Sequence, residues 1–65
     1  MKLIKTTIRV GDYVTIKAPG SWLDGEWGVV KSIDSDGTYY VAPYGEDDTQ
    51  LVFDKSELRK MEYHQ

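Results

Sequence analysis

The stretch that decides the fold is Val10–Ile33, which reads VGDYVTIKAPGSWLDGEWGVVKSI. The pair Gly11-Asp12 predicts a turn, because glycine tolerates a positive φ and an aspartate side chain accepts hydrogen bonds from nearby backbone. After this turn the residues alternate between two faces, as they do along a β-strand. The face predicted to point inward carries Val14 and Ile16.

Residues 18–25 predict a loop after this first strand. Pro19 lacks an amide donor, so a regular strand should end there. Trp22 and Leu23 are large apolar residues within this polar segment. They must either fold back onto the sheet or stay exposed.

The second strand is predicted over residues 27–33. Val30 and Ile33 are an odd number of positions apart, so strict alternation cannot place both on the inner face. A β-bulge near Lys31-Ser32 would reconcile them, and bulges also help a small sheet to curl.

The remainder of the sequence predicts three further short strands separated by turn residues. The expected elements are a tight turn over 34–37, a strand over 38–42, an acidic loop over 43–48, a strand over 49–53, one 3-10 turn over 54–57 with Asp54 as its N-cap, and a closing strand over 58–61.

Five short strands in 65 residues predict an all-β fold, and a closed barrel removes the exposed strand edges of an open sheet. The chain is expected to be one domain with its core over about 8–61, preceded by a lead-in or edge strand over 1–7 and followed by a frayed tail over 62–65. Four glycines, Gly11, Gly25, Gly28 and Gly37, are predicted to serve turns or bulges. The predicted inward set is Val10, Val14, Ile16, Val30, Ile33, Tyr39, Val41, Leu51, Phe53 and Leu58.

Composition narrows the functional classes. The chain has no cysteine, which excludes disulfides and thiolate metal sites, and it contains no apolar run long enough for a signal peptide or a membrane span. We therefore expect a soluble, cytoplasmic protein with no membrane partner. The net charge of −3 and the scattered Lys and Arg residues disfavour nucleic acid as the main partner, because phosphate binding needs clustered cations.

The glycine and hydrophobic spacing resembles the SH3-like barrel superfamily, with a KOW-type signature. The residues that carry the resemblance are Gly11-Asp12-x-Val14-x-Ile16, Gly25-x-x-Gly28-x-Val30-x-x-Ile33 and Phe53-x-x-x-Glu57-Leu58. It covers about residues 8–61 and implies a small five-stranded SH3-like barrel with one 3-10 turn before the last strand. One barrel shape serves many roles, so the resemblance implies a fold more strongly than a function.

Two groups within this superfamily share further residues with the chain. The run from Val14 to Asp34, with Trp22 in its loop, is similar to the small SH3-like subunits of photosynthetic complexes, which are docking proteins. Gly11-Asp12, Trp22 and Gln50-Leu51-Val52-Phe53 resemble, more loosely, type II dihydrofolate reductase. The active-site motif of that reductase is Val-Gln-Ile-Tyr, whereas residues 49–52 here read TQLV and lack the tyrosine. That reductase acts as a tetramer, so a monomer would exclude this alternative.

Aromatic residues are the main candidates for a binding surface. Alternation places Tyr13 and Tyr40 on outward faces, while Trp22 and Tyr44 fall in loops, and grouped surface aromatics mark interaction sites. The candidate partner-binding residues are Tyr13, Trp22, Trp27, Tyr40 and Tyr44. We expect Trp22 and Tyr44 to flank a groove floored by Tyr13 or Tyr40. The alternative is that Trp22 and Trp27 cap the open ends of the barrel, since tryptophan is usually substantially buried.

A second set of candidates is acidic: Asp24, Glu26, Asp34, Asp36, Glu46, Asp47 and Asp48. These carboxylates either attract a basic partner or form solvated loop surfaces. Asp34-x-Asp36-Gly37 lacks the remaining ligands of a calcium loop, and His64 has no neighbouring metal ligand or catalytic base in the sequence.

No nucleophile, phosphate-binding or dinucleotide motif occurs. The sequence therefore predicts a non-catalytic, cofactor-free, monomeric module that binds a protein. The alternatives are a KOW-type nucleic-acid-binding module and, more distantly, a reductase of the type II kind.

Overall fold

The computed structural model describes residues 7–61, which form five strands and one 3-10 turn. In chain order these are β1 (Tyr13–Ile16), β2 (Trp27–Ile33), β3 (Thr38–Pro43), β4 (Leu51–Asp54), η1 (Lys55–Glu57) and β5 (Leu58–Lys60). This confirms the predicted all-β class with a single 3-10 turn before the last strand. Residues 7–9 form no strand. The lead-in or edge strand predicted over 1–7 lies, apart from Thr7, outside the described residues, and so does the frayed tail predicted over 62–65.

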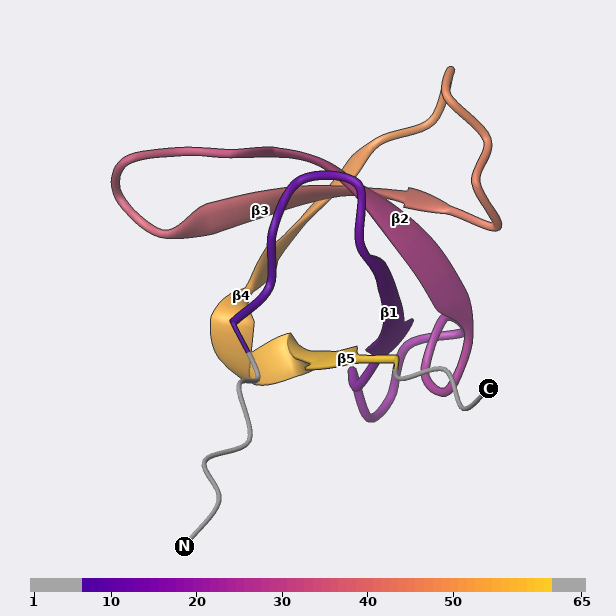
Figure 1. Cartoon of the computed structure of the whole chain (residues 1–65). Coiled ribbons are helices and arrows are strands. Elements are labelled where there is room, and N and C mark those ends of the chain that lie inside the picture. Colours follow the sequence, from indigo (N-terminus) through magenta and orange to yellow (C-terminus); the bar gives the residue numbers. More distant parts are fainter. Residues whose placement is uncertain (1–6, 62–65) are drawn as a thin grey trace, which may run out of the picture.

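All five strands belong to one antiparallel sheet with the order β4-β3-β2-β1-β5. The sheet curls strongly, and η1 links the strands at its two edges by contacting both β4 and β5 (Figure 1). Asp54 stands at the N-cap of η1, as predicted, and its backbone N–H donates to Glu57 Oε1 at 2.9 Å. The curled sheet therefore has an inner face, which forms the core, and an outer face.

The predicted β-bulge in β2 is confirmed. Val30 pairs with Val41 and Ser32 pairs with Tyr40, so the register shifts by one residue at Lys31. The shift leaves Val30 buried and allows Ile33 to pack against the core as well. A regular strand would have turned one of these two side chains to the outer face.

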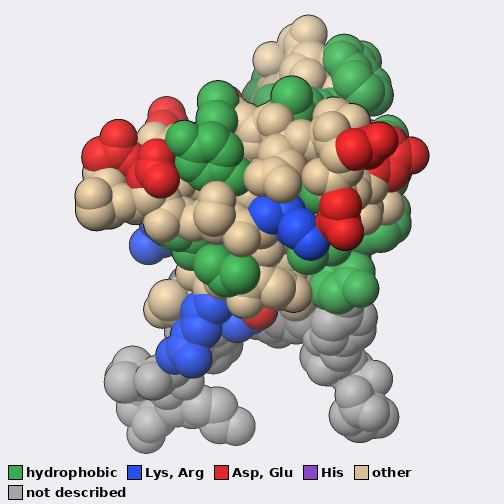
Figure 2. Space-filling model, turned by 90° about the horizontal axis from the view of Figure 1, so that it is seen from above, with side chains coloured by type: hydrophobic (Ala, Val, Ile, Leu, Met, Phe, Trp, Pro, Cys, Tyr) green, Lys and Arg blue, Asp and Glu red, His purple; other side chains and the backbone are tan. Residues whose placement is uncertain are grey.

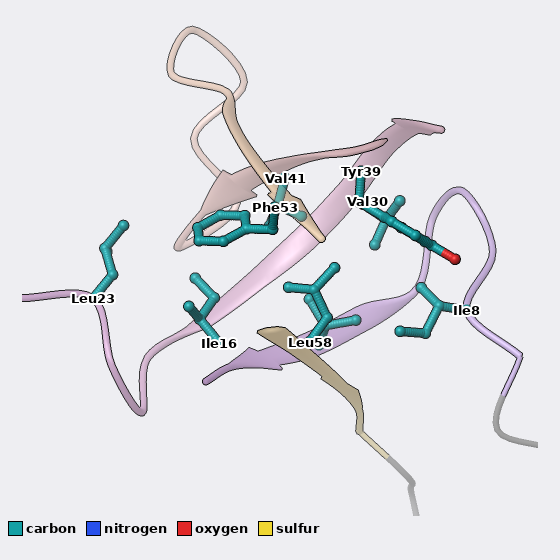
Figure 3. Packing of buried hydrophobic residues seen from close by; sticks show 9 residues of the cluster. Ile8, Ile16, Leu23, Val30, Tyr39, Val41, Phe53 and Leu58 are labelled. Atoms are coloured by element: carbon teal, nitrogen blue, oxygen red, sulfur yellow. The ribbon is translucent and has the colours of Figure 1, made fainter. Parts of the chain in front are cut away.

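The core contains nine buried residues from the strands and from two irregular segments (Figure 3). They are Ile8, Val14, Ile16, Leu23, Val30, Tyr39, Val41, Phe53 and Leu58. Seven of them were predicted to point inward, and the predicted residues Ile33 and Leu51 are partly buried against them.

Four residues lie where the predicted inward set did not place them. Val10 was placed in the core, but it lies in the turn before β1 and is 60% exposed. Ile8, from the segment before that turn, and Leu23, from the β1–β2 loop, point into the core instead (Figure 3). Ala42 is also fully buried, although it alternates with the inward-facing Val41.

Gly28 has a different role from the one predicted. It lies within β2 opposite Pro43, not in a turn or at the bulge. A Cβ atom at Gly28 would lie 2.5 Å from Val41 Cγ1 and 3.1 Å from the backbone oxygen of Ala42, so the glycine allows β2 and β3 to pack closely. Gly37 matches its prediction, since it has a φ of 92° in the hairpin turn between β2 and β3.

Candidate functional site

Three of the five candidate aromatic residues meet on the outer face of the sheet. Tyr13 and Trp27 are stacked, with ring centroids 5.7 Å apart and an interplanar angle of 25°. Tyr44 meets Trp27 edge to face, with centroids 6.3 Å apart and an angle of 87°. All three remain exposed, by 44%, 38% and 39% of their surface respectively. We refer to these three residues as the aromatic cluster.

The strand register explains why these rings meet. Thr15 pairs with Trp27 and Tyr13 pairs with Val29, so Tyr13 and Trp27 are diagonal neighbours on adjacent strands. Diagonal pairs on one face are within reach of each other when the side chains are aromatic. Tyr44 directly follows β3, and its backbone N–H donates to the carbonyl oxygen of Trp27 at 3.0 Å. The cluster thus joins three neighbouring strands.

Tyr44 has an unusual backbone conformation. Its φ is +57°, and among the described residues it is the one non-glycine residue with a positive φ. Gly45 follows with a φ of +77°, and the N–H of Glu46 donates to the carbonyl oxygen of Pro43 at 3.0 Å. Two successive positive φ angles in a turn closed in this way are typical of type I′, which favours Asn-Gly. A bulky residue at the first position is strained, by about 1–3 kcal/mol.

Neighbouring groups hold both the ring and the hydroxyl of Tyr44. Partial burial raises the pKa of Tyr44, and the charge and hydrogen bond of the Glu26 carboxylate, with a further contribution from Glu46, raise it more. The indole of Trp27 lies against the next residue, because a Cβ atom on Gly45 would be 3.4 Å from Trp27 Cη2. The cluster therefore has two carboxylates at one end.

The other two candidates lie apart from the cluster. Trp22 is 77% exposed in the β1–β2 loop, so the alternative in which it caps the end of the barrel is wrong. Tyr40 lies on β3, where its hydroxyl donates to Asp34 Oδ2 at 3.0 Å, and this hydrogen bond raises its pKa. The expected groove combined Trp22 with Tyr44, whereas the ring contacts of the described residues join Tyr44 to Trp27.

The position of Trp27 removes the capping alternative for this residue as well. Its ring belongs to the outer cluster rather than to the core. The sequence offered no signal for the contact between Trp27 and Tyr44, because that contact depends on a tyrosine in a backbone conformation that glycine or asparagine usually adopts.

Acidic side chains gather at two opposite ends of the molecule in Figure 2, over the β2–β3 hairpin and over the β3–β4 loop. A basic side chain lies against the second group. The corresponding ion pair joins Lys31 Nζ to Asp47 Oδ1 at 2.6 Å. Lys60 Nζ forms a second ion pair, with Asp12 Oδ2 at 3.4 Å.

Within residues 7–61, no group of three metal-ligating side chains comes together, and no helix is long and apolar enough to cross a membrane. His64 lies outside the described residues. The site is thus an exposed surface of three contacting aromatic rings, with the carboxylates of Glu26 and Glu46 near enough to raise the pKa of Tyr44. No protein-family model matches the chain, and the searches of curated proteins and of solved structures found no match to it either.

Proposed function

We propose that the chain is a non-catalytic module that binds a protein partner through the aromatic cluster. The observation that carries this proposal is the left-handed conformation of Tyr44. Asparagine or glycine would form the same turn with less strain. A tyrosine that destabilises its own turn, yet keeps its ring exposed beside Trp27, is better explained by binding than by folding.

The physical character of the cluster supports the same function. Tyrosine and tryptophan offer a large contact area with few rotatable bonds, and they dominate the energetics of many protein interfaces. The stacked and edge-to-face contacts fix the rings in place before a partner arrives. Less conformational entropy is then lost on binding.

The proposal also draws on the resemblance of the glycine and hydrophobic spacing to the SH3-like barrel superfamily, whose members include docking proteins. The chain folds as one antiparallel five-stranded sheet with η1 before the last strand. We further propose that the module acts as a monomer in the cytoplasm, as an accessory subunit of a larger assembly.

The test is affinity capture from the native host with the wild-type chain and with Tyr44→Asn. The substitution keeps the turn and removes the ring, so we expect the partner to be lost while the melting temperature stays close to that of the wild type. Val52→Asn is the matched control, because Val52 is an exposed apolar residue (58%) on β4. Retention of every captured protein by Tyr44→Asn would exclude the aromatic cluster as the docking surface.

One observation favours the alternative of a nucleic-acid-binding module. Arg59 pairs with Thr15 in the β1–β5 register, and Lys17 alternates with Thr15, so both cations lie on the same outer face as Tyr13, next to Thr15. Against it, Lys31 and Lys60 are paired with aspartates. Titration with single- and double-stranded RNA and DNA at low salt decides between the two, because electrostatic binding to phosphates is strongest there.

A further inference from the structure

We propose that the segment of the partner that docks on the aromatic cluster is basic, with an arginine side chain lying against Trp27 and Tyr44 and pairing with Glu26 and Glu46. This inference rests on the proposed function and names the chemistry of the partner.

The first argument is the position of the two carboxylates. Glu26 directly precedes Trp27, and Glu46 directly follows Gly45, whose backbone lies against the Trp27 indole. The Glu46 N–H closes the turn that carries Tyr44 by donating to the carbonyl oxygen of Pro43 at 3.0 Å, and, in addition to partial burial, the nearby charges of Glu26 and Glu46 both raise the pKa of Tyr44. One acidic residue therefore adjoins Trp27 along the chain, and the other belongs to the turn that carries Tyr44.

The second argument is the lack of a neutralising cation at this place. In the described part of the chain the two salt bridges use Asp47 and Asp12, so neither Glu26 nor Glu46 has a basic partner there. The outward-facing cations nearest to Trp27 by register are Arg59, which Thr15 separates from Trp27, and Lys17, two residues along the chain from Thr15. Neither belongs to the two salt bridges of the described residues. Within the described residues, the carboxylates of Glu26 and Glu46 thus form no ion pair that a basic ligand would have to displace.

The third argument is the match to a guanidinium group. A planar cation is attracted to the face of tryptophan or tyrosine, and its N–H groups bind carboxylates in a fixed geometry. Arginine makes both interactions at once, whereas lysine is a compact and more strongly hydrated charge. A surface that combines exposed aromatic rings with unpaired carboxylates is complementary to arginine in both respects.

The experiment uses the full chain with Trp22→Phe, so that Trp27 is the one fluorescent tryptophan. The probe is an arginine hexapeptide, compared with a lysine hexapeptide and a glutamate hexapeptide. We expect the arginine peptide to change the Trp27 emission in a saturable manner, the lysine peptide to bind more weakly, and the glutamate peptide to leave the emission unchanged. Glu26→Gln and Glu46→Gln should each weaken the binding of the arginine peptide by about threefold or more.

The control must separate a local site from general attraction to an acidic protein. Asp36→Asn removes the same charge in the β2–β3 hairpin, where an amide oxygen can still accept the hydrogen bond from the Thr38 N–H. We expect this variant to bind the arginine peptide as tightly as its parent. Equal weakening by Asp36→Asn and by Glu26→Gln would overturn the inference, as would an unchanged Trp27 emission or preferential binding of a single-stranded oligonucleotide.

The outcomes distinguish this inference from the proposed function. Loss of the native partner on Tyr44→Asn, together with no binding of the arginine peptide, would leave the protein-binding function in place and refute a basic partner. Binding of the arginine peptide that survives Tyr44→Asn would refute the cluster as the site of recognition.

Discussion

The β1–β2 loop and the β3–β4 loop each carry a large aromatic residue, but they hold it in opposite ways. In the first loop Leu23 enters the core and Trp22, its neighbour, is 77% exposed. In the second loop residues 44–50 contain no buried residue, and Tyr44 is held against Trp27 by a strained turn.

The difference shows two ways to fix a surface loop. The β1–β2 loop is anchored by burial of one leucine, and the hydrogen bond from the Ala18 N–H to Asp24 Oδ1 at 2.9 Å braces it. The β3–β4 loop is fixed at the surface by backbone geometry, by a ring contact and by the ion pair between Lys31 and Asp47. Of the two loop aromatics, Tyr44 is the one that a ring contact holds at the surface.

The largest loss of stability is expected when the buried side chain of Leu23, which anchors the β1–β2 loop, is removed. Leu23→Ala removes a side chain that is 3% exposed and should cost about 3 kcal/mol of unfolding free energy, through lost burial and the cavity left behind. Trp22→Ala is the adjacent control and should cost less than about 1 kcal/mol. Denaturant unfolding of both variants checks this, and a larger loss for Trp22→Ala would reverse the assignment of the anchor.

A smaller effect is expected at the turn of the β3–β4 loop. Gly45→Ala puts a Cβ atom at a residue with a φ of 77° and 3.4 Å from the Trp27 ring. Strain in the left-handed region should lower the unfolding free energy by about 1–2 kcal/mol. The variant should also change the near-UV circular dichroism of Trp27. A melting temperature equal to that of the wild type would show that this turn does not hold the ring.

The ion pair between Lys31 and Asp47 should contribute less to the unfolding free energy than the turn of the β3–β4 loop does. Lys31→Gln removes the contact with Asp47, whose side chain is 78% exposed, so water screens the attraction. The expected loss is about 0.5 kcal/mol or less, and added salt should abolish the difference from the wild type. A loss above about 1.5 kcal/mol would mean that the pair anchors the loop as firmly as a buried residue.

The smallest change in stability is expected for Tyr44→Asn. The loss of an edge-to-face pair, about 0.5–1.5 kcal/mol, is offset by relief of backbone strain of similar size. Thermal melts should therefore place this variant within about 0.5 kcal/mol of the wild type, or slightly above it in stability. A large destabilisation would show that the tyrosine is retained for folding and would remove the main argument for a binding role.

The sequence predicted those parts of the molecule in which local pattern determines structure. Alternation placed Val14 and Ile16 inside and Tyr13 outside, and the odd spacing of Val30 and Ile33 required the bulge that the structure contains. These features follow from the period of two along a strand, which tertiary contacts do not alter.

The remaining features depend on contacts between segments that are distant in the sequence. Leu23 and Trp22 are adjacent in a loop without periodicity, so no pattern could show which of them enters the core. Ile8 is buried and Val10 is exposed, because the turn before β1 directs Ile8 inward and Val10 outward. The positive φ of Tyr44 was beyond sequence prediction, since local preference opposes it.

The bond from Lys60 Nζ to the carbonyl oxygen of Thr7, at 3.2 Å, brings together residues that are 53 positions apart. The first and last described residues of the domain therefore lie near each other, on the side where Lys60 also pairs with Asp12. A domain with neighbouring ends can be grafted into a loop of an unrelated host protein through two short linkers, with little entropy lost on closure. The aromatic cluster could in this way be transferred to another protein without cutting any of the strands that form it.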